Sequence, residues 1–240
     1  MSLQARFICG LVIFCILAPR GAAWGQEADP WQGFNRAIFT FNDTLDSYVL
    51  EPIAKAWHRA IPDRVEQSIA NVFQNAYTPI VAANNLLQAK PHDAAVDVAR
   101  FIANTTFGVV GVFDVASQWG LDKHDEDFGQ TLAVWGVPAG PYLVLPFIGP
   151  STPRDALGYG VDSIATVYWF FADIRFTIGP QTVQVVNSRA QVLDAVRELK
   201  EASLDYYAAV RNAYLQRRAR QIRNEREDSG PGEDFYRIEE

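Results

Sequence analysis

The segment DPWQGFNRAIFTFN, from Asp29 to Asn42, carries the clearest fold signal in the chain. Asp29 can cap a helix, Pro30 suits the first helical position, and Gln32 stands at the spacing of a capping box. A kink is expected where Pro52 follows. Apolar side chains recur every three or four residues and predict one face of an amphipathic helix: Phe34, Ile38, Phe41, Leu45 and Tyr48.

Similar signals predict further helices along the chain. A helix start combines a capping residue or proline with an apolar repeat, and four later segments have such signals. These segments begin at Asp63, near Pro91, at Ser188 and at Ser203. Pro79 is expected to break or bend the helix that contains it. Leu204 and Tyr207 are expected to face inward in the last helix.

Three short apolar segments interrupt the helical pattern. They are Thr105 to Ala116, Tyr142 to Leu145, and Ile164 to Phe171. Each is shorter than the roughly 20 residues that a helix needs to cross a bilayer. Glycines and prolines in the stretch from Gly129 to Gly149 predict an extended hairpin or loop. The sequence therefore predicts a mostly α-helical single domain, either lying in one face of a membrane or closed around a well-filled core.

The composition argues against several classes of protein. The chain has 240 residues, enough for one sizeable core, and 49% of them are hydrophobic, which argues against a disordered chain. The formal net charge is −7, whereas a nucleic-acid partner would require a basic face. Basic residues gather in one short stretch near the C-terminus: Arg217, Arg218, Arg220 and Arg223.

The two ends of the chain are expected to lie outside the folded domain. Residues 1–25 combine a short basic start, an apolar run and small residues before position 26, which predicts a cleaved secretory signal peptide. The alternative is an uncleaved N-terminal anchor. Both cysteines lie within this signal, and neither has a suitable context for acylation, so no lipid anchor is expected. Residues 26–227 form the predicted domain, and residues 228–240 form a disordered acidic tail.

No catalytic arrangement is evident in the sequence. The chain lacks a G-x-S-x-G elbow, and none of its three histidines has another His or Cys at metal-ligand spacing. The acidic run around His124 predicts a solvated turn. Arg154 and Asp155 predict a neighbouring pair that stabilises a loop with little energetic weight. We therefore expect neither catalysis nor a bound metal or cofactor.

Several ordered motifs together resemble the MlaA family, also called VacJ. The resemblance covers the chain from Asp29 to Arg218. After the opening segment, the matching motifs are FIANTTFGVVGVFDVA from Phe101, FGQTL from Phe128, GPYLVLPF from Gly140, Arg154–Asp155, SRAQVLD from Ser188 and AYLQRR from Ala213.

This resemblance implies a ring-like helical protein in the inner leaflet of a bacterial outer membrane. Its amphipathic channel would let phospholipids of the outer leaflet reach the periplasm. The implied partners are a soluble periplasmic lipid carrier of the MlaC type and a trimeric outer-membrane porin. The best-known members are lipoproteins, whereas this chain lacks a convincing lipobox. Attachment would then rest on apolar burial at the periplasmic face and on the porin.

Three functions are compatible with the sequence. The leading hypothesis is a phospholipid conduit that removes mislocalised phospholipids from the outer leaflet, passes them to the periplasmic carrier and so maintains lipid asymmetry. The alternative is a structural envelope protein that docks on porins without moving lipid. The third is an enzyme such as a lipid hydrolase, and the missing nucleophile motif speaks against it.

Candidate site residues follow from the leading hypothesis. Phe41 and Asn42 are expected to help hold the channel closed, the alternative being core packing for Phe41 and solvent exposure for Asn42. The hairpin is expected to be a mobile gate that offers an apolar face to acyl chains, or else a rigid structural loop. The expected lipid-path or gate residues are Phe41, Asn42, Gly108, Gly111, Phe113, Tyr142, Leu143, Leu145 and Phe147.

The four C-terminal arginines are expected to contact the carrier or lipid head groups. The alternative is that they complement the dipole of the helix that they end. Truncation after Gln216 is expected to leave the fold and membrane association intact and to weaken carrier binding.

Overall fold

The computed structural model describes residues 29–170 and 178–224 and is mostly helical there, as predicted. The predicted signal peptide, the acidic tail and Phe171 of the third apolar segment lie outside the described residues. The helices and strands are α2 (Gln32–Leu45), η1 (Asp46–Leu50), α3 (Glu51–Ala60), α4 (Asp63–Leu87), α5 (Pro91–Thr106), α6 (Val115–Gln118), α7 (Phe128–Val134), β1 (Leu143–Leu145), β2 (Gly149–Ser151), α8 (Pro153–Phe170), α9 (Ile178–Gln191), α10 (Leu193–Ala202) and α11 (Tyr206–Arg223).

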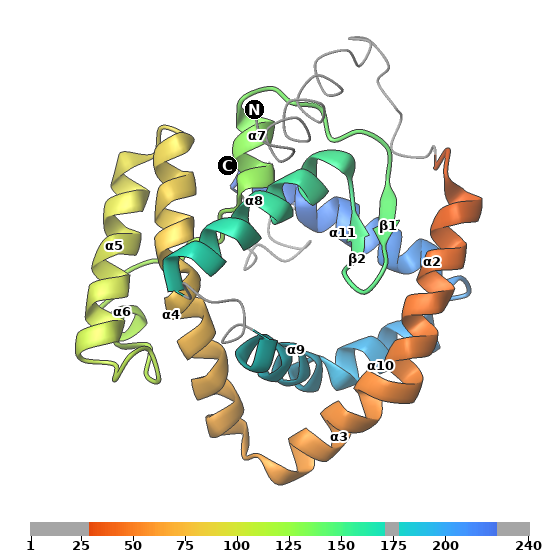
Figure 1. Ribbon diagram of the computed structural model, residues 1–240, viewed down its shortest axis with the longest axis horizontal. Coiled ribbons are helices and arrows are strands. Elements are labelled where there is room, and N and C mark those ends of the chain that lie inside the picture. The colour runs from red at the N-terminus through yellow and green to blue at the C-terminus, as the bar shows by residue number, and fades with distance from the viewer. Residues whose placement is uncertain (1–28, 171–177, 225–240) are drawn as a thin grey trace, which may run out of the picture.

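The elements follow one another around a ring (Figure 1). Along one half, α2, η1 and α3 continue directly into one another, and α4 begins after a short turn. Along the other half, α4 contacts α8, α7 contacts α8 and α11, and α11 contacts β2. The circuit closes where β1 packs against α2. Helix α9 bridges α3 and α4, while α5 packs on the outside of α4 and carries α6.

The first helix begins at Gln32, but the predicted capping box is wrong. Trp31 occupies the N-cap position, and its side chain makes no capping hydrogen bond. The Asp29 carboxylate instead accepts hydrogen bonds from the Asn35 side-chain amide, at 2.9 Å, and from the Tyr207 hydroxyl. Asp29 therefore fastens α2 to the distant α11, a long-range contact that local spacing does not reveal.

Two prolines, Pro52 and Pro79, lie within the helices of the ring. Pro52 lacks the N–H that an α-helix would use to bond the carbonyl of Tyr48, and the chain passes this region through the π-helical turn η1. Pro79 lies inside α4, which continues to Leu87, so the chain does not break there. The starts predicted at Asp63 and Pro91 are confirmed.

The C-terminal helices begin elsewhere than predicted. Ser188 lies within α9, which starts at Ile178, so the predicted helix start at Ser188 is wrong. The last helix is capped by Asp205, which accepts a hydrogen bond from the Ala208 N–H at 3.2 Å. Tyr207 is buried as predicted, but Leu204 precedes the helix and is fully exposed.

Polar side chains supply much of the interior, and large apolar side chains lie on the outside. The fully buried side chains include Asn35, Asn85, Asp97, Gln130 and Thr131. The buried apolar cluster is small, consisting of Tyr142, Val144 and Tyr207. A well-filled helical core, one of the two alternatives, is therefore not what the described residues form. Exposed apolar side chains include Phe34, Tyr48, Ile102, Phe107, Val110, Phe113, Trp119, Phe147 and Ile164.

No membrane-crossing helix is found in the described part of the chain, because no helix there is both long and apolar enough.

Candidate functional site

The predicted hairpin is present, but it is shorter than expected. Strands β1 and β2 pair antiparallel, with Leu143 opposite Ser151 and Leu145 opposite Gly149. The preceding residues from Phe128 to Val134 form α7 instead of extended chain, so the boundary at Gly129 is wrong. Asp127 caps this helix by accepting a hydrogen bond from the Gln130 N–H at 2.9 Å. This D-x-x-Q spacing is a capping-box signal that the sequence interpretation missed.

Two asparagines on α2 bind the backbone of the hairpin. The Asn35 amide accepts from the Val144 N–H at 2.9 Å and donates to the Tyr142 carbonyl at 3.0 Å. The Asn42 amide donates to the Leu145 carbonyl and accepts from the Phe147 N–H, both at 2.9 Å. Seven residues separate the two asparagines, which places them two turns apart on one helix face. One face of α2 therefore provides hydrogen-bond partners for the backbone of the hairpin, as a neighbouring strand would.

The tip of the hairpin also meets α2 through aromatic rings. Phe41 and Phe147 are in edge-to-face contact, with ring centroids 5.5 Å apart. Both remain open to the surroundings, with exposed fractions of 47% and 76%. Asn42 is thus engaged with the hairpin, and the alternative of a solvent-exposed asparagine without such a contact is wrong.

The faces of the hairpin differ from one another. Leu143 and Leu145 are half-buried on one face, while Tyr142 and Val144 are buried on the other. Tyr142 packs against the rings of Tyr207 and Tyr214 on α11 and so does not belong to an exposed apolar face. The structure therefore brings Phe41 and Asn42 of α2 next to the hairpin. The hairpin residues at this surface are Leu143, Leu145 and Phe147.

The remaining lipid-path candidates lie in a different place. Gly108, Gly111 and Phe113 belong to the loop between α5 and α6, on the outside of α4 (Figure 1). Gly111 has a φ of +90°, and a side chain there would collide with Asn75. The loop exposes apolar residues, and Val109 and Val110 have φ values of 54° and 58°, which β-branched residues rarely adopt.

Buried polar contacts hold this apolar loop. The Arg100 guanidinium donates two hydrogen bonds of 3.1 Å to the Asp114 carboxylate. Asn104 donates to Asp114 at 3.0 Å and accepts from the Ala116 N–H at 2.8 Å. The loop is thereby fixed in a shape that keeps its apolar side chains exposed.

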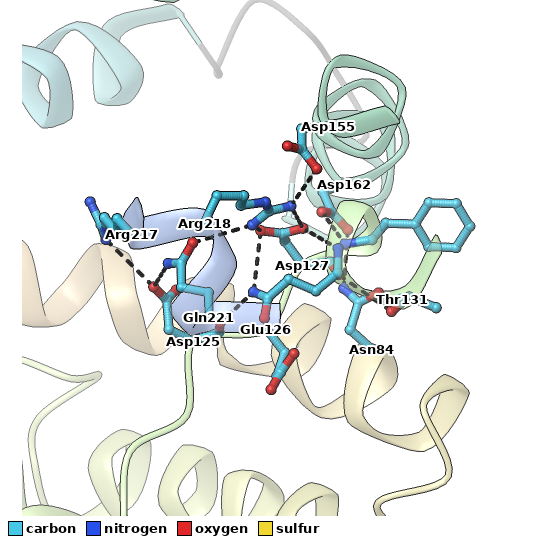
Figure 2. A network of polar contacts seen from close by, with 12 residues as sticks. Asn84, Asp125, Glu126, Asp127, Thr131, Asp155, Asp162, Arg217, Arg218 and Gln221 are labelled. Atoms are coloured by element: carbon cyan, nitrogen blue, oxygen red, sulfur yellow. Dashed lines mark hydrogen bonds and ion pairs between the residues drawn. The ribbon is translucent and has the colours of Figure 1, made fainter. Parts of the chain in front are cut away.

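The four C-terminal arginines do not share one environment. Arg218 is largely buried and forms ion pairs with Asp127, at 2.7 Å, and with Asp155, at 2.9 Å (Figure 2). Arg217 is mostly exposed and lies 3.7 Å from Asp125. Arg220 and Arg223 stand in the last turn of α11. Truncation after Gln216 would remove the largely buried Arg218, so we now expect the truncated chain to lose stability.

Arg218 determines the charge state of its partners. Burial alone would raise the pKa of Asp127 and of Asp155. The hydrogen bonds and positive charge of Arg218 outweigh burial, and the pKa of each aspartate lies below its ordinary value. Both carboxylates are therefore ionised at neutral pH, and they join α11 to α7 and α8.

Arg154 and Asp155 contribute more to the fold than the loop-stabilising pair that the sequence predicted. Both side chains are buried, and Asp155 also accepts a hydrogen bond from the Tyr214 hydroxyl at 2.7 Å. Helices α7 and α8 pack closely next to this pair. A side chain at Gly158 on α8 would come within 2.3 Å of the Gly129 nitrogen on α7. Two adjacent residues in a sequence do not reveal a buried network of this kind.

The acidic run around His124 is not a solvated turn. Glu126 is buried and accepts hydrogen bonds from Gln88 at 2.8 Å and from Lys90 at 2.9 Å. His124 lies 2.9 Å from the buried Asp97, and this hydrogen bond raises the pKa of the imidazole. The run therefore fastens the chain between α6 and α7 to α4 and α5.

One group of side chains in the described part of the chain brings metal-ligand atoms together: His58, Asp63 and Glu66. The sequence search overlooked it because it required a second His or Cys.

The comparisons with known proteins agree with this architecture. The family model described as MlaA lipoprotein matches residues 27–221. The intermembrane phospholipid transport system lipoprotein MlaA of Escherichia coli K12 is 36% identical over 211 residues, which cover 86% of this chain and 82% of the relative. Its counterpart in Haemophilus influenzae is 35% identical over 195 residues, covering 80% and 78% respectively.

A solved structure supports the same relationship. It comes from work on the structural basis for maintenance of bacterial outer membrane lipid asymmetry. The two chains are 34% identical and superpose with a TM-score of 0.72, over 82% of this chain and 100% of the other. The chain therefore belongs to the MlaA family.

Proposed function

We propose that the chain is a phospholipid conduit of the bacterial outer membrane. It would remove mislocalised phospholipids from the outer leaflet and pass them to a periplasmic carrier of the MlaC type, which maintains lipid asymmetry. The observation that carries this proposal is the distribution of polarity in the ring. Polar side chains such as Asn35, Asn85 and Gln130 are buried, while large apolar ones such as Phe107 and Phe147 are exposed.

This distribution suits a protein surrounded by lipid. Large apolar side chains exposed to water would be unfavourable by about 1.5–3 kcal/mol each, relative to burial in an apolar phase. Contact with acyl chains removes this penalty. Without a crossing helix in the described residues, the ring would lie in the periplasmic leaflet after export and removal of residues 1–25. A trimeric porin would add a second attachment in place of a lipid anchor.

The hairpin is the proposed gate of the conduit. Its tip is attached to α2 by the Asn42 amide and by the contact between Phe41 and Phe147. These are few interactions, so the tip can open without disturbing the ring. Opening would expose Leu145 further, next to the half-buried Leu143, as an apolar surface for acyl chains. The exposed loop with Gly108, Gly111 and Phe113 would contact lipid on the other side of α4.

Arg217, Arg220 and Arg223 are the proposed contact site for the carrier or for anionic head groups. Arg218 is excluded from this site because it is engaged with two aspartates inside the protein. Replacement of Arg220 and Arg223 by glutamine should weaken recovery of the carrier in a pull-down by much more than it lowers the unfolding temperature. Equal recovery would leave these arginines with a role in the helix dipole alone.

Lipid binding tests the function itself. Native mass spectrometry of the purified full chain should detect co-purified phospholipid, and the mass should be that of a chain beginning at position 26 without an acyl group. The alternative, a structural protein that docks on porins, predicts a porin complex without bound phospholipid. An enzyme would instead convert added phospholipid, and we propose no catalysis.

A further inference from the structure

The corner of the ring between α3 and α4 gathers three metal-ligand side chains. His58 lies in the last turn of α3, Asp63 is the first residue of α4, and Glu66 lies one turn further on. One ligand atom from each residue lies within 4.8 Å of the other two. An imidazole nitrogen and two carboxylate oxygens thus meet across the turn that joins the helices.

The Glu66 carboxylate is the unusual member of this group. Its side chain is 4% exposed, whereas that of His58 is 48% exposed. The described residues provide one donor to this carboxylate, the His58 Nδ1 nitrogen, at 3.3 Å from each oxygen. Charge-assisted hydrogen bonds of this kind are usually about 2.7–2.9 Å long. Glu66 is therefore a buried carboxylate with only a weak partner.

Neighbouring amides do not compensate the Glu66 carboxylate. The Asn187 and Gln191 side chains both come from α9, and both donate to the Glu66 backbone carbonyl, at 3.0 and 3.2 Å. A buried carboxylate is stable when it is paired with a cation or coordinates a metal. A divalent metal ion held by these side chains would supply the missing positive charge.

We propose that His58, Asp63 and Glu66 bind a divalent transition-metal ion, with Zn²⁺ as the best fit. Imidazole together with carboxylate suits Zn²⁺, whereas Mg²⁺ and Ca²⁺ prefer oxygen ligands alone. Three protein ligands leave the fourth tetrahedral position for water. Asp63 and His58 are exposed, so the ion can enter from outside, and their side chains can rotate to close around it.

The site would stiffen the ring. The metal would join the end of α3 to the start of α4 at the point where the chain turns. Helix α9 is fastened to the same corner, because Asn187 also accepts a hydrogen bond from the Trp57 indole at 3.1 Å. The ion would thus fix the angle between three helices. This inference does not depend on phospholipid transport.

Binding of Zn²⁺ to the purified full chain tests the site. Isothermal titration calorimetry should give one Zn²⁺ per chain, and excess Mg²⁺ should not displace it. Glu66→Gln and Asp63→Asn should each lower the affinity by at least ~100-fold, since even outer hydrogen-bond partners of metal ligands are worth about 10–100-fold. Bound Co²⁺ should show the visible absorption of a tetrahedral site.

Two further variants make the outcome decisive. His92→Gln is the matched control, because His92 is exposed and pairs with Asp93 at 3.1 Å outside the site. It should bind Zn²⁺ as the wild type does. Asp63→Asn alters an exposed side chain and keeps the test valid if Glu66→Gln does not fold. Wild-type protein without stoichiometric Zn²⁺, or an Asp63→Asn variant with undiminished affinity, would overturn the proposal.

Discussion

Asn42 holds the tip of the hairpin against α2, and its replacement by alanine should release the tip. The substitution removes two hydrogen bonds, one to the Leu145 carbonyl and one from the Phe147 N–H. At about 0.5–1.5 kcal/mol each, they are worth about 1–3 kcal/mol, or roughly a 5- to 150-fold rise in the open population. The Phe147 N–H is exposed, which favours the lower end of this range.

Amide hydrogen exchange measures this opening residue by residue. In Asn42→Ala, the Phe147 amide should exchange roughly 5-fold faster or more. The Val144 amide should change less, because it is bound by Asn35. Thr44→Ala is a suitable control, since the Thr44 hydroxyl bonds the Thr40 carbonyl within α2. Unchanged exchange at Phe147, or equal acceleration in the control, would refute the idea that Asn42 holds the tip.

Three further predictions follow from other contacts. Arg218→Met leaves Asp127 without its cation and Asp155 with Arg154 alone, and it should lower the free energy of unfolding by about 1.5–3 kcal/mol in urea titrations, whereas Arg217→Met should change it by less than about 0.5 kcal/mol. The pKa of His124 is raised in the folded chain, so the stability it contributes is complete below its unfolded pKa of about 6.5 and is lost as pH rises through the folded value. Thermal unfolding at several pH values should detect this loss, and His124→Asn should remove it. A cleavable cross-link between cysteines introduced at Phe41 and Phe147 should block lipid export until it is reduced, and full activity of the linked form would exclude the gate.

The sequence predicted the features that depend on local chemistry. The helix starts at Asp63 and Pro91 were correct, although neither helix has a side-chain cap. Pro91 suits the first turn of α5 because the N–H that it lacks has no partner within the helix there. The extended segment around Val144 was correct because flanking prolines exclude it from a helix. The ordered motifs, beginning with the segment from Asp29, identified the family.

The partners of polar residues could not be predicted in the same way. Asn35 and Asn42 have the spacing of surface residues on an amphipathic helix, yet they bind a hairpin more than 100 residues away in the chain. Arg218 belongs to an arginine-rich run that suggested a binding surface, yet it lies between two aspartates. Hydropathy assigns polar residues to the outside, and this rule fails where apolar side chains occupy much of the exterior.

Transfer of phospholipid tests the central claim most directly. The protein is placed in vesicles that contain a labelled phospholipid, and release of the label to a soluble lipid carrier is measured over time. A conduit predicts release that depends on both the protein and the carrier, and that stops when the hairpin is cross-linked to α2. Release no faster than from protein-free vesicles, with the ring correctly folded and membrane-bound, would contradict the account and favour the structural alternative.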